Sequence, residues 1–140
     1  MSANGKGLGI RKKETLSLLW IFLLFNMVYA DIISLMDPVS PIRKAIAGAP
    51  LPPGGLIAGA VLMETPIAML LFARVLKYGV NRWLNIIIAA INLVAVVTGG
   101  RGLYYFFFAS IEVLCLASII WLAIRWQNPE TAPADPPAAG

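Results

Sequence analysis

The chain has 140 residues, of which 59% are hydrophobic and only 13% are charged. Soluble domains are about half apolar and about a quarter charged, so this balance excludes an ordinary soluble domain and indicates a membrane protein. The sequence has no histidine and a single cysteine. These counts exclude an intramolecular disulfide or a CxxC redox pair, and they remove the commonest haem and transition-metal ligand.

Four apolar stretches follow one another along the chain, and each can supply the roughly 20 helical residues that cross a bilayer. They cover residues 15–36, 55–76, 82–99 and 103–126. We therefore predict an all-α membrane protein, with four transmembrane helices in an antiparallel bundle over residues 15–126. A basic arm at 1–14 precedes the bundle, and a Pro/Ala-rich tail at 127–140 follows it.

The first apolar stretch has a second interpretation. Its basic start, its apolar run and the sequence Val28-Tyr29-Ala30 resemble a signal peptide with its cleavage site. Apolar residues resume after Asp31 with the sequence IISLM, however, so we expect the helix to be retained.

The connections differ in length and composition. Residues 37–54 form a long loop rich in proline and glycine, in which the sequence RKAIA (43–47) is expected to form an amphipathic turn on the membrane surface. The connections at 77–81 and 100–102 are short, so the helices that they join should be antiparallel neighbours.

Basic residues are unevenly divided between the two ends of the predicted bundle. One end carries Lys6, Arg11, Lys12, Lys13, Arg74, Lys77, Arg82 and Arg125. The other carries Arg43, Lys44 and Arg101. The positive-inside rule then predicts that both termini of this multi-pass protein are cytoplasmic. We interpret these charges as topology signals that contact lipid headgroups, and we expect no nucleic-acid partner.

Each predicted helix carries one strongly polar side chain near its middle. These residues are Asn26, Glu64, Asn92 and Glu112. At about 1.5 Å per residue, each lies about 14–16 Å into its helix, close to the centre of a hydrocarbon core about 30 Å thick. Ala60 and Ala68 flank Glu64 on the same helical face, and small residues favour close helix contact. We therefore predict that the four polar side chains face protein, and that the two glutamates face either the bundle interior or an oligomer interface.

The two glutamates are the most unusual members of this set. A bare carboxylate at the bilayer centre costs about 3 kcal/mol, and no basic residue is predicted at the same depth. We expect Glu64 and Glu112 to form a protonated or proton-sharing pair, hydrogen-bonded to Asn26 and Asn92. The pattern predicts a site that binds a proton, a cation or another ligand, although a polar clasp that only fixes helix register remains the alternative.

Four further residues are secondary candidates for this site. Asp31 is predicted near the outer membrane boundary, and Asn85 shares a helical face with Asn92. Pro66 lacks an amide N–H and so leaves the carbonyl of Leu62 without its helical partner. Tyr105 is predicted either in an interfacial aromatic belt or at the mouth of a cavity.

Three functions are consistent with these features. The first is a proton-coupled transporter or channel for a small molecule or ion, which we expect to form a homo-oligomer in contact with membrane lipids. The second is a non-catalytic subunit of a larger membrane complex, and the third is an enzyme acting on a lipid or isoprenoid. Because no nucleotide loop, metal cluster or nucleophile-and-base pair is recognisable, we predict no catalytic residue, metal or cofactor.

The sequence also resembles a family of small bacterial membrane proteins that is catalogued only as a domain of unknown function. The likeness includes the stretches TLSLLWIFLLFNMVYADI, METPIAMLLFARVLKYGVNRWLNIIIAAI and FFFASIEVLCLASIIWLAIRWQNPE. Its most specific part contains Glu64, Pro66, Arg74, Lys77, Asn81, Arg82, Trp83 and Asn85. The resemblance implies a bacterial four-helix protein, for which we expect a multi-pass position in the inner membrane, and it implies no activity.

Overall fold

Four long helices and one short helix make up the part of the chain that the computed structural model describes, residues 3–50, 52–100 and 102–127. They are α1 (Ala3–Ser34), α2 (Pro41–Ile46), α3 (Gly55–Val75), α4 (Tyr78–Gly99) and α5 (Leu103–Ile124). The described residues contain no strand. Four of the helices, all except α2, contain a segment long and apolar enough to cross a membrane, which confirms the predicted all-α membrane fold.

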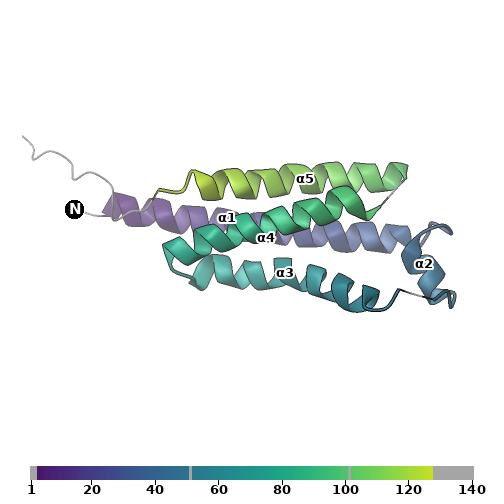
Figure 1. Cartoon of the computed structure of the whole chain (residues 1–140). Helices are drawn as coiled ribbons and strands as arrows, with labels where there is room; N and C mark the ends of the chain where they lie inside the picture. The colour runs from purple at the N-terminus through teal and green to yellow at the C-terminus, as the bar shows by residue number, and fades with distance from the viewer. Residues whose placement is uncertain (1–2, 51, 101, 128–140) are drawn as a thin grey trace, which may run out of the picture.

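The long helices run antiparallel in chain order (Figure 1). α1 packs against both α3 and α5, and α4 packs closely against α5 and less extensively against α3. We call the end where α1 begins and α5 ends the basic end, because Lys12, Lys13, Arg74 and Arg82 lie there. The opposite end, which carries α2, is the loop end (Figure 1).

Two helices begin earlier than the sequence predicts. α1 begins at Ala3, so most of the segment 1–14 is part of a helix rather than a separate arm. No proline interrupts the chain from there to Ser34, and an established helix extends at little further cost. α4 begins at Tyr78, inside the predicted loop 77–81. The predicted tail lies outside the described residues beyond Gln127.

The long connection at the loop end contains the predicted turn as the helix α2. Ser40 caps its start, since its Oγ accepts a hydrogen bond from the Arg43 backbone N–H at 3.1 Å, and Pro41 occupies the first helical position. Arg43 Nη1 also donates to the carbonyl of Leu35 at 2.9 Å. This bond fastens α2 to the end of α1.

The bundle interior is built on one stripe of α1. Leu16, Trp20, Leu23 and Met27 are buried and recur at helical spacing, so they form one continuous face. They belong to a core that includes buried residues of α3, α4 and α5. The outward faces are also apolar, with side chains such as Phe25 exposed. Apolar residues on both faces suit a bundle surrounded by lipid.

At the basic end, cationic side chains bind the last carbonyls of two helices. Lys13 Nζ donates to the carbonyl of Leu76 at 2.8 Å, just after α3. Lys12 Nζ donates to the carbonyl of Arg125 at 3.3 Å, and Arg82 Nη2 donates to the last residue of α5 at 3.2 Å. Cations at helix C-termini satisfy free carbonyls and complement the helix dipole. These residues therefore have a structural role in addition to the predicted effect on topology.

Tyr105 holds the turn between α4 and α5. Its hydroxyl donates a hydrogen bond to the carbonyl of Val96, and its ring lies over Gly100. A Cβ atom added at Gly100 would lie 2.5 Å from the Tyr105 ring. Tyr105 is thus a packing residue of this turn and does not line the groove described below.

We expect Gly100→Ala to lower the stability of the protein by about 1–3 kcal/mol, because the new methyl group must displace the Tyr105 ring. Gly59→Ala is the matched control, since a Cβ there meets nothing within 4 Å. Thermal unfolding in mild detergent measures both variants. Equal melting temperatures for the two would contradict the packing described for Tyr105.

Candidate functional site

Glu112 is the buried carboxyl of the bundle. It lies near the middle of the α5 span, and its side chain is only 6% exposed. Asn26 of α1 donates from Nδ2 to Glu112 Oε1 at 2.9 Å, and the same nitrogen lies 3.3 Å from the carbonyl of Phe108. Among the described residues, Asn26 is the one side chain hydrogen-bonded to this carboxyl. The predicted contact between Glu112 and Asn26 is therefore present.

Glu64 does not face the bundle interior and does not pair with Glu112, which corrects that part of the prediction; its predicted position at an oligomer interface stays a prediction. Its side chain is exposed on the outer surface of α3. At about 100° per residue, Glu64 points away from the face of α3 formed by the buried residues Pro66, Met69 and Ala73. The Glu64 carboxyl therefore lies on the outer face of α3, near the middle of the helix.

Asn92 forms a second polar contact, with α3. Its Nδ2 donates to Thr65 Oγ1 at 2.9 Å, and the Thr65 hydroxyl donates to the carbonyl of Leu62 at 2.7 Å. This is the carbonyl that Pro66 leaves without its helical partner. Asn92 Oδ1 is buried, and no described residue donates a hydrogen bond to it. Thr65, which had not been a candidate residue, therefore supplies the hydrogen bond that Pro66 cannot give to this carbonyl.

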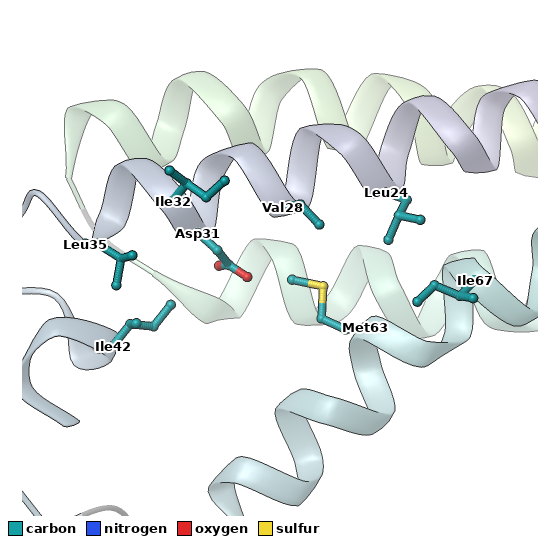
Figure 2. Close-up of a pocket in the computed structure, with 8 residues that line it drawn as sticks. All are labelled: Leu24, Val28, Asp31, Ile32, Leu35, Ile42, Met63 and Ile67. Atoms are coloured by element: carbon teal, nitrogen blue, oxygen red, sulfur yellow. The ribbon is translucent and has the colours of Figure 1, made fainter. Parts of the chain in front are cut away.

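The proline coincides with a change in how α3 packs. Residues 55–61, which precede it, are all exposed, whereas Pro66 and Met69 are buried. Figure 2 shows this first part of α3 turning away from α1 beyond Met63. Proline and a threonine that bonds back to its own helix are both known causes of helix bending.

Nearer the basic end, a chain of side-chain hydrogen bonds connects three helices. Trp20 Nε1 donates to Asn85 Oδ1 at 2.7 Å, and Asn85 Nδ2 donates to Asn81 Oδ1 at 2.6 Å. Asn81 Nδ2 in turn donates to the carbonyl of Ala73 at 2.6 Å. All three side chains are fully buried. We call this chain of bonds the asparagine clasp.

Only part of this clasp was predicted from the sequence. Asn85 was a candidate site residue, whereas Asn81 and Trp20 had no assigned role. The spacing of Asn81, Asn85 and Asn92 along one face of α4 was the available signal, because all three are buried there. The partner of Asn85 on α1 had no comparable signal, since tryptophan is also common at membrane interfaces.

The structure therefore divides the predicted site. Asn26 and Glu112 join α1 to α5, Asn92 joins α4 to α3, and no hydrogen bond between described residues links these two contacts. Asp31 lies in neither contact. It lines an open groove of about 410 Å³ between α1, α2 and α3 (Figure 2). The described residues contain no cluster of acidic, cysteine or histidine side chains suited to a metal ion.

Comparison with known proteins gives a family but no activity. No curated protein and no solved structure matches the chain. A model described as "Family of unknown function (DUF6326)" matches residues 8–133. The match extends over all of α2 to α5 and most of α1. The chain therefore belongs to this family of unknown function.

Proposed function

We propose that Glu112 and Asn26 form a protonatable site near the middle of the membrane, and that the protein couples proton movement there to transport of a small molecule or ion. The observation that carries the proposal is the buried carboxyl of Glu112 with one amide partner at 2.9 Å. A carboxylate in this position costs about 3 kcal/mol unless it is compensated, so buried acids in membrane helices commonly have a function.

The other polar contacts of the bundle support this interpretation. Where two helices are joined by neutral groups, this chain uses asparagine, as at Asn85 and Asn92. Asparagine can both donate and accept hydrogen bonds, and it has no charged state to stabilise. What glutamate adds at position 112 is the ability to release a proton. Asn26 supports this role, because its N–H group holds the carboxyl in a fixed position.

The proline within α3 supports transport rather than a static bundle. Interrupted helices near the membrane centre are common in transporters, where freed backbone groups line the site and one half of the helix moves. In this chain α3 is continuous, but Pro66 frees a backbone carbonyl near its middle, and the exposed half at 55–61 has few neighbours to hold it. We propose that this half changes position during transport.

We expect Glu112→Gln to abolish proton-coupled flux in reconstituted vesicles, because glutamine keeps the hydrogen bond to Asn26 but cannot release a proton. Thermal stability should be unchanged or slightly higher, since a costly carboxylate is removed. A pH-sensitive dye inside the vesicles reports the flux, and Glu14→Gln, at an exposed position in α1, is the control. Undiminished proton flux in Glu112→Gln vesicles would exclude the proposed role of this carboxyl.

We also propose that both termini are cytoplasmic in a bacterial inner membrane, because the basic end carries most of the cationic residues. Cysteines replacing Ala47 and Lys77 lie on exposed positions at opposite ends of the bundle. With the buried Cys115 changed to alanine, an impermeant thiol reagent applied to cells should label position 47 only. Labelling of position 77 from outside the cell would show that the bundle has the opposite orientation in the membrane.

A second candidate function, as a subunit of a larger membrane assembly, is favoured by Glu64. This carboxyl is exposed near the middle of the α3 span, where contact with lipid is unfavourable. Packing against another chain would remove it from lipid. A second copy of this chain would give the homo-oligomer that a thin bundle needs for transport, and other subunits would give an accessory role.

We expect a native mass in mild detergent that corresponds to two or more copies of the 15.1 kDa chain. Glu64→Leu should shift the assembly toward the monomer if the carboxyl makes a polar contact between copies. Wild-type protein that purifies as a monomer and shows no flux would instead support a subunit that requires other chains. Val61→Leu, on an exposed position of the same helix, is the control.

A further inference from the structure

The groove between α1, α2 and α3 is lined by eight residues, seven of which are apolar. The apolar lining includes Leu24 and Val28 of α1, Leu35 just after α1, Ile42 of α2, and Met63 and Ile67 of α3. Asp31 is the remaining residue, and Figure 2 shows its carboxyl directed into the space between the three helices. The volume of about 410 Å³ lies within the range of small-molecule sites.

The Asp31 carboxyl has no cationic partner among the described residues. Its backbone carbonyl accepts a hydrogen bond from Ser34 Oγ at 2.7 Å, but no bond to its side chain is formed by the described part of the chain. Arg43 is the nearest basic residue along the chain, and its guanidinium donates to Leu35 O instead. The groove therefore presents one carboxyl on an otherwise apolar wall.

The position of Asp31 along α1 keeps its carboxyl accessible. It lies one turn before Ser34, where the candidate α1 span ends. The splayed first half of α3 keeps the groove open, because residues 55–61 do not close over it. A ligand can therefore place a charged group at the membrane boundary while its apolar body lies deeper, beside Val28 and Ile67.

We propose that this groove binds an organic cation with an apolar body, whose positive charge lies against Asp31. The charge complementarity is specific, since an anion would be repelled by the carboxylate and a neutral hydrocarbon chain would leave it unpaired in an apolar setting. The proposal does not depend on proton exchange at Glu112, because it concerns binding on the opposite side of α1. It is tested by a binding measurement, so that the two proposals can fail separately.

Tetraphenylphosphonium is a suitable probe, because its single positive charge is surrounded by apolar rings. Equilibrium binding to the purified full-length protein in mild detergent should saturate. Asp31→Asn should weaken this binding about tenfold or more, since it removes the charge and keeps the side-chain size. Asp37→Asn is the matched control: this residue lies outside the groove, and its Oδ1 accepts a bond from Val39 N that asparagine can also accept. It should bind the probe as the wild type does.

A second variant tests the groove itself. Ile67→Trp fills the apolar wall and leaves Asp31 in place, so it should also weaken binding about tenfold or more. Its native circular dichroism and melting temperature would show that the fold is kept. No saturable binding by the wild type, or equal affinity in the wild type and both groove variants, would overturn the proposal. A co-purifying lipid that the probe fails to displace would also overturn it, by assigning the groove to lipid.

Discussion

In hydrocarbon, a polar group has no water to bind, so each buried donor and acceptor must find its partner within the bundle. The carbonyl that Pro66 frees shows how strictly this applies. Thr65 binds it, and Asn92 binds Thr65 from the neighbouring helix. One missing backbone N–H thus leads to a contact between α3 and α4, and most of the buried polar side chains follow the same requirement, although Asn92 Oδ1 receives no hydrogen bond from a described residue.

The same constraint makes α4 the polar centre of the bundle. Its buried face carries three asparagines, and through them it is bonded to Trp20 of α1 and to α3 at two levels. Each of these amides is neutral, so burial requires hydrogen bonds but no countercharge. Against this background, Glu112 on α5 is chemically different. It is held by one amide of α1, and that difference is why we assign the functional role to it.

The sequence predicts the level of each polar residue along its helix much better than the direction in which its side chain points. Apolar length placed all four long helices, and the count of residues along each helix placed Asn26 and Glu112 at levels where they can meet. The face that Glu64 occupies could not be predicted, because α3 is apolar on every side and has no polar stripe to mark its exterior. On α4, by contrast, the three asparagines mark the buried face directly. Neighbouring alanines were a poor guide on α3, since small residues suit a lipid-facing surface as well as an interface.

The two proposed sites share α1 and lie on different sides of it. Asn26 faces Glu112 on α5, whereas Asp31 is about 140° further round the helix and faces α2 and α3. A cation bound at Asp31 and a proton bound at Glu112 would therefore act on the same helix without touching each other. If α1 has two positions, a ligand that favours one of them changes proton affinity at Glu112, and the proton changes ligand affinity by the same factor. Coupling of the proton affinity to the ligand affinity in this way requires no channel between the two sites, because a shift of α1 is sufficient.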